Sequence, residues 1–96
     1  MLTGKQRRFL RAMGTGIDPI FQIGKGGMNE NLLKQLDDAL EARELIKVKV
    51  LANSEELPKE VAGEIADATG SELVQVIGKN MLFFRQSKKK PRLELP

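Results

Sequence analysis

The chain has 96 residues, a length that fits one domain, because each of two smaller domains would bury too little apolar area. Its net charge is +3. It contains neither cysteine nor histidine, which excludes disulfides, the usual zinc sites and the Ser/His or Cys/His nucleophile pairs. Residues 1–27 and 75–96 are basic, whereas residues 28–74 carry eleven acidic and five basic side chains. The two ends would therefore meet a polyanion, and the acidic middle is expected to face solvent.

The first predicted element is a helix that begins after Thr3 and ends near Met13, before the sequence Gly14-Thr15-Gly16. Helical spacing places Gln6, Phe9, Leu10 and Met13 on one side, and the cations Lys5, Arg7, Arg8 and Arg11 on the other. No acidic residue pairs with these cations within the helix. They are either a solvated face or a surface for phosphates.

A short strand over residues 20–23 leads into the loop Gly24-Lys25-Gly26-Gly27, and Asn29 caps a second helix just beyond it. Glycines let a backbone approach a phosphate closely, and Lys25 adds charge on a long arm. We expect the N–H groups of Gly24, Gly26 and Gly27 to serve as donors. The alternative is that these glycines only make a tight turn.

The remaining segments continue the alternation of strands and helices. Residues 45–51 alternate as a strand with Lys47 and Lys49 exposed, residues 53–56 form a polar loop, and a third helix runs from Pro58 to Gly70. Residues 73–77 and 81–85 are predicted as strands joined tightly at Gly78-Lys79-Asn80. Residues 1–86 then form a single domain, and residues 87–96 form a mobile basic tail that adds nonspecific affinity.

The predicted fold class is an α/β two-layer sandwich of order α-β-α-β-α-β-β with a mixed four-stranded sheet. Right-handed crossovers make the first three strands parallel, with the last strand antiparallel to them. The loops after the first and third strands then leave the same edge, which brings Lys25 and Lys79 to one surface. Phe83 and Phe84 point to opposite faces. We favour packing for both, with stacking of one on a base as the alternative.

Four segments of the chain resemble the CRM domain family in its stand-alone, bacterial YhbY-like form. They are residues 2–11, 23–27, 39–49 and 74–79, which match in order and spacing. The resemblance implies a fold like the C-terminal domain of translation initiation factor 3. It also implies RNA binding through Gly24 to Gly27 and the basic helix, and association with precursors of the large ribosomal subunit.

The composition and charge pattern predict a non-catalytic, cytoplasmic RNA-binding protein, and the resemblance implies that it binds rRNA within pre-50S particles and assists assembly of the 50S subunit. No cofactor, metal or small-molecule substrate is expected. The expected RNA-binding residues are Gly24, Lys25, Gly26, Gly27, Lys5, Arg7, Arg8, Arg11, Lys47, Lys49 and Lys79. The alternative function is a protein-interaction module that docks on a ribosomal protein or an assembly GTPase.

Overall fold

The computed structural model describes residues 2–52, 54 and 57–96. The elements in chain order are α1 (Gly4–Gly14), β1 (Phe21–Ile23), α2 (Glu30–Arg43), β2 (Leu45–Val50), α3 (Pro58–Thr69), β3 (Glu72–Ile77) and β4 (Asn80–Phe84). This is the predicted order, with boundaries shifted by a residue or so. The predicted loop at 53–56 lies outside the described residues apart from Ser54.

Local capping explains where the helices begin. Thr3 and Gln6 form a reciprocal capping box at the start of α1, with N···O distances of 3.0 and 3.1 Å. The Asn29 side chain accepts from the Leu32 N–H at 2.8 Å and caps α2. Since these contacts join residues three positions apart, they follow directly from the sequence.

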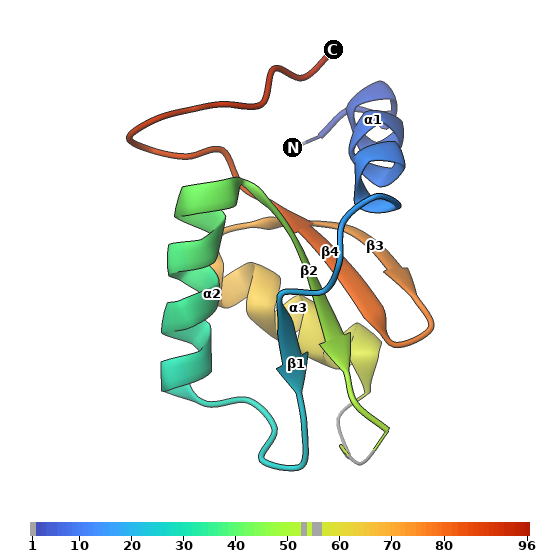
Figure 1. Cartoon of the computed structure of the whole chain (residues 1–96), viewed down its shortest axis with the longest axis vertical. Helices are drawn as coiled ribbons and strands as arrows, with labels where there is room; N and C mark the ends of the chain where they lie inside the picture. The colour runs from blue at the N-terminus through green and yellow to red at the C-terminus, as the bar shows by residue number, and fades with distance from the viewer. Residues whose placement is uncertain (1, 53, 55–56) are drawn as a thin grey trace.

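The sheet has the strand order β1-β2-β4-β3. β1 pairs with β2 in parallel, and β4 runs antiparallel to both β2 and β3. The first three strands are therefore parallel and the last is antiparallel, as predicted. The chain's final strand lies in the interior of the sheet (Figure 1).

Helices lie on both faces of this sheet. α2 and α3 cover one face, where the core is formed by Ile23, Leu36, Leu40, Ile46, Val48, Val50, Val61, Ala62, Ile65, Met81 and Phe83. α1 packs on the opposite face, against Leu45, Val74, Leu82 and Phe84. The two-layer prediction therefore describes the sheet with α2 and α3, and α1 adds a partial third layer (Figure 1).

Phe83 and Phe84 are both buried, with exposed fractions of 0% and 6%. Phe83 belongs to the core beneath α2 and α3, and Phe84 packs in the smaller cluster beneath α1, with Leu93 and Leu95 against it. The favoured packing interpretation is confirmed, and neither ring offers a face to a base.

Residues 87–96 are not the mobile tail that the sequence predicts. After β4 the chain bends over the carboxyl end of α2 and returns toward α1 (Figure 1). Hydrogen bonds from residues 87–93 to two carboxylates of the α2 region fix this path. We call residues 87–93 the tail clip.

Candidate nucleic-acid interface

The glycine loop forms a tight turn. The N–H of Gly27 donates to the Gly24 carbonyl at 3.0 Å, and Gly27 has a φ of 65°, which favours glycine. Lys25 and Gly26 are exposed at the tip, and a Cβ added at Gly26 would meet no atom within 4 Å. The expectation that Gly27 offers a free N–H is therefore wrong, because the turn itself uses that donor.

The glycine loop and the β3–β4 turn lie at the same end of the sheet. Here the Leu51 N–H donates to the Ile23 carbonyl and the Val50 N–H to the Lys79 carbonyl, both at 2.8 Å. The end of β2 thus lies between the two turns. Lys25 and Lys79 share this end as predicted, but a strand separates their backbones.

Lys47 and Lys49 project from β2 on the face that carries α1. Lys49 pairs across the sheet with Gln22 and Asn80 and is exposed, whereas Lys47 is half-buried. The carboxyl end of α1 borders a shallow hollow of about 150 Å³ on this face. Its lining residues are Gly14, Thr15, Lys47, Gln75, Ile77, Asn80, Met81 and Leu82. The part of the sheet that α1 leaves uncovered therefore combines the two lysines with apolar surface, including Ile77, which is 62% exposed.

On α1, the predicted basic face is only partly free. Lys5, Arg8 and Arg11 are exposed. Arg7 is half-buried, and its Nη1 donates to the carbonyls of Leu73 at 2.7 Å and Val74 at 3.4 Å. Those carbonyls lie at the irregularity in the β3 pairing, so Arg7 fastens α1 to the sheet and is not a free phosphate contact.

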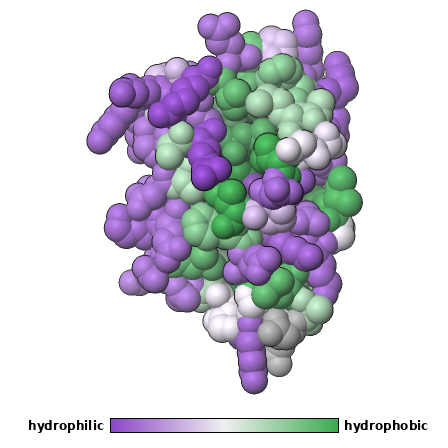
Figure 2. Space-filling view, in the orientation of Figure 1, coloured by the Kyte–Doolittle hydropathy of each residue, from purple (hydrophilic) through white to green (hydrophobic). Residues whose placement is uncertain are grey.

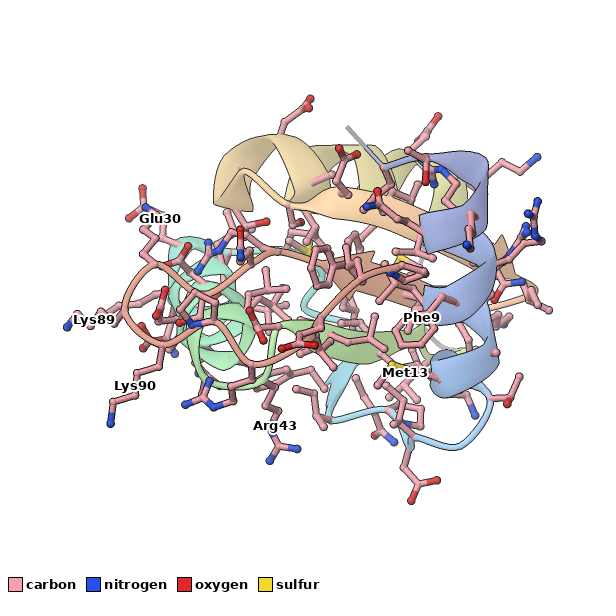
Figure 3. The ribbon with its side chains drawn as sticks, turned by 90° about the horizontal axis from the view of Figure 1, so that it is seen from above. Phe9, Met13, Glu30, Arg43, Lys89 and Lys90 are labelled. Carbon is pink, nitrogen blue, oxygen red and sulfur yellow. The ribbon has the colours of Figure 1, made fainter. Side chains whose placement is uncertain are left out.

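Phe9 also departs from the predicted pattern, since 37% of its surface is exposed although helical spacing assigned it to the core side. Leu10 is buried as predicted, and Gly14, which was not assigned to that side, is buried as well. Figure 3 shows Phe9 and Met13 on the side of α1 that faces the end of the chain.

α1 and the glycine loop do not form one compact binding surface. Figure 1 places α1 at the opposite end of the long axis from the β1–α2 loop, and the molecule extends 37 Å along that axis. The lysines of β2 lie between them. We call this arrangement the basic stripe: Lys5, Arg8, Arg11, Lys47, Lys49, Lys79 and Lys25.

Two carboxylates that the sequence assigned to a solvated acidic region hold the tail clip. Glu44 is fully buried and accepts from the N–H groups of Ser87, Arg92 and Leu93, each at 2.8 Å. Glu41 accepts from the Ser87 hydroxyl and from the N–H groups of Lys88 and Lys89, the latter two at 3.0 and 3.2 Å. No local pattern reveals these contacts, which join residues more than 40 positions apart.

The electrostatics of these two groups follow from their donors. The Ser87 hydroxyl, then the N–H groups of Lys88 and Lys89, lower the pKa of Glu41 from 4.5 to about 2. Burial raises the pKa of Glu44, but the N–H groups of Ser87, Leu93 and Arg92 outweigh it, and the net shift is downward. Both carboxylates are therefore ionised at neutral pH and bind the tail as anions.

Among the described residues there is no group of three or more acidic side chains placed to hold a metal ion. No described helix is long and apolar enough to span a membrane.

A mixed sheet with helices on both faces and a stripe of cations, of which only Lys47 is half-buried, defines a small α/β domain with a surface suited to polyanions. The chain belongs to the CRS1 / YhbY (CRM) domain family, whose match covers residues 2–85.

Relatives agree with this assignment over the whole chain. The "Probable RNA-binding protein YqeI" of Bacillus subtilis (strain 168) is 52% identical over 96 residues, with both chains covered completely. An "RNA-binding protein" of Haemophilus influenzae is 32% identical and covers 99% of this chain and 95% of its own. The solution structure of the hypothetical protein SAV1595 from Staphylococcus aureus matches with a TM-score of 0.81 and 59% identity over the full length of both chains.

Proposed function

We propose that this protein is a non-catalytic RNA-binding protein that binds rRNA and assists assembly of the large ribosomal subunit. The observation that carries the proposal is the meeting of the Lys25 turn, the end of β2 with Lys49, and the Lys79 turn at one end of the sheet. The names of two relatives, in Bacillus subtilis and Haemophilus influenzae, describe RNA-binding proteins and support the same function.

The basic stripe suits phosphates better than bases. It consists of lysine and arginine side chains, which are long, flexible and positively charged. No fully exposed aromatic ring lies on the sheet, since Phe83 and Phe84 are buried and Phe21 is only partly exposed. Phosphate contacts position an RNA backbone and give salt-dependent affinity, whereas sequence is read from base edges. We therefore infer that the domain recognises the shape of a folded rRNA segment more than its sequence.

Affinity for purified 23S rRNA, measured as a function of salt, tests this proposal. The double variant Lys25→Ala/Arg8→Ala is expected to bind more weakly and to reduce the slope of log K against log salt by roughly 1.5, about 0.7–0.9 for each lost phosphate contact. Lys34→Ala is the control, because Lys34 lies on α2 and already pairs with Asp38 at 3.5 Å. Unchanged binding by the double variant would contradict the assignment of the basic stripe.

Association with ribosomal particles tests the assembly role. We expect the protein to sediment with pre-50S particles and to be released by complete RNA digestion. If it remains bound to a purified ribosomal protein or GTPase after digestion, a protein-docking function replaces this proposal.

A further inference from the structure

The tail clip is built around the backbone rather than the side chains of its cations. Five backbone N–H groups donate to the carboxylates of Glu41 and Glu44. They belong to Ser87, Lys88, Lys89, Arg92 and Leu93. The Ser87 hydroxyl closes the turn by accepting from the Lys90 N–H at 3.0 Å. This network fixes the path of the chain while leaving the lysine side chains free to point outward.

The carboxylates at the end of α2 and just after it take their hydrogen bonds from groups other than the tail lysine side chains. Glu41 and Glu44 are occupied by backbone donors, Asp38 pairs with Lys34, and Asp37 pairs with Arg85. In the part of the chain that the structure describes, Lys88, Lys89 and Lys90 are exposed and form no ion pair. The three ammonium groups are therefore exposed and free to contact phosphates, although the charged carboxylates of Glu41 and Glu44 hold the backbone of the same segment.

Arg43 extends this row of exposed lysines. It is exposed at the last residue of α2, and Figure 3 shows Arg43, Lys89 and Lys90 projecting away from the body of the molecule. Figure 2 shows hydrophilic side chains reaching outward at the upper left, where Figure 1 has the bend of the tail. Arg92 is not available in the same way, since its Nη1 donates to the Ala42 carbonyl at 2.8 Å.

This cationic row lies far from the glycine loop. The loop precedes the amino end of α2, and the clip crosses its carboxyl end, so the 14 residues of the helix separate the two. At about 1.5 Å per residue this separation is roughly 20 Å. The two regions therefore cannot contact the same phosphate.

We propose that the tail clip presents Lys88, Lys89, Lys90 and Arg43 as a second phosphate-binding surface, through which the domain holds a second segment of the RNA bound by the basic stripe. This inference rests on the proposed RNA-binding function. RNA is favoured over a membrane because no aromatic or branched apolar side chain lies among residues 88–92 to enter a lipid interface. The carboxylates of Glu41 and Glu44 fix the backbone of the tail clip, and this backbone determines where the lysine side chains extend from the surface.

Binding of purified 23S rRNA, with the full chain, separates this surface from the first. Lys88→Ala/Lys89→Ala/Lys90→Ala is expected to weaken binding roughly 10-fold at moderate salt and to lower the salt slope by about 2. Its effect should multiply with that of Lys25→Ala, because distant sites act independently. Lys34→Ala again serves as the control.

Glu41→Gln tests whether an ordered clip is needed. The variant keeps every cation but replaces an acceptor oxygen with an NH₂ group that faces N–H donors. We expect faster amide exchange at Lys88 and Lys89, faster tryptic cleavage after residues 88–90, and about 3-fold weaker RNA binding. Binding equal to or tighter than that of the native protein, with these amides exposed, would show that the tail acts as a loose polycation and would overturn the inference.

The remaining outcomes distinguish the two proposals. If the triple lysine variant binds 23S rRNA with the native affinity and slope while Lys25→Ala/Arg8→Ala weakens it, the second surface is refuted and the first stands. If the native protein does not bind 23S rRNA, the proposed function fails and the inference falls with it. Loss of binding only to anionic phospholipid vesicles would assign the row to a membrane and also overturn the inference.

Discussion

Glu44 combines a strained backbone with a buried charge, two features that are each unfavourable alone. Its φ is 67° and its ψ is −40°, a sparsely populated conformation that costs a residue with a Cβ about 1–3 kcal/mol. At this position its N–H donates to Leu40 and its carbonyl accepts from Arg85, so the residue ends α2 and also joins β2 to β4. The three donors on its carboxylate give a physical reason for glutamate where the backbone alone would favour glycine.

The lowered pKa of Glu41 predicts an acid-sensitive clip. Because the folded state holds this pKa at about 2 against an ordinary 4.5, the folded state binds fewer protons and gains stability from the ionised form. That contribution is complete above pH of about 4.5 and is lost as the pH falls toward 2. NMR titration should show the Glu41 carboxyl and the Lys88 amide titrating together in this range. A Glu41 midpoint near 4.5 would mean that the clip is not formed in solution.

At the scale of elements, α1 approaches the sheet closely because Gly14 has no side chain. A Cβ at this position would lie 2.6 Å from Leu82 Cδ2 and 3.1 Å from its Cδ1, and Leu82 is buried. Glycine is thus required by packing here and not by its backbone angles. α3 contains a contrasting glycine, Gly63, where an added Cβ would meet nothing within 4 Å.

These two glycines form a matched pair for mutation. Gly14→Val should lower the free energy of unfolding by about 1–3 kcal/mol, because Leu82 must move within a packed cluster. Gly63→Ala should raise it by about 0.5–1 kcal/mol, since alanine is favoured in an exposed helix interior. Chemical denaturation measures both. Equal changes in the two variants would mean that α1 does not pack as described.

Most elements could be predicted because their determinants are local. Thr3, Asn29 and Pro58 mark helix starts, and Gly70, with a φ of 67°, ends α3 as expected. The roles of Arg7 and Glu44 could not be predicted. Each depends on a partner more than 40 positions away, and a charged residue on an amphipathic helix gives no sign that its end will be buried.

The same limit applied to the candidate site. The position of Lys25 at a turn tip follows from the glycines around it, and alternation in β2 predicts the direction of Lys47 and Lys49. The distance between α1 and the glycine loop does not follow from the sequence, because it depends on the end of the sheet at which α1 packs. For the same reason the sequence did not show that the cations form an extended stripe and not one compact binding surface.

At the scale of the whole molecule, the carboxyl-terminal residues complete the second core. Leu93 and Leu95 are partly buried against the cluster of Leu10, Leu45, Val74, Leu82 and Phe84. The tail therefore contributes apolar contacts to the folded domain in addition to its charges, although composition alone marks it as a solvated extension.

Removal of residues 87–96 is therefore expected to destabilise the domain. The loss should be on the order of 2 kcal/mol, from re-exposure of apolar surface beneath α1 and from the lost carboxylate contacts. A lower midpoint of thermal unfolding, measured against the full chain, checks this prediction. A truncated protein with native stability would indicate that the tail is as mobile as its composition suggests.

The interior position of β4 has a consequence for synthesis. β2 and β3 are both made before β4, and neither pairs with the other, so each lacks its partner until the residues of the last strand are available. A nascent chain that ends before residue 80 holds only the short β1–β2 pair, and the sheet closes in a single late step. Closure of the sheet therefore waits for residues 80–84, because neither β2 nor β3 has its partner until these residues have been made and are free to pair.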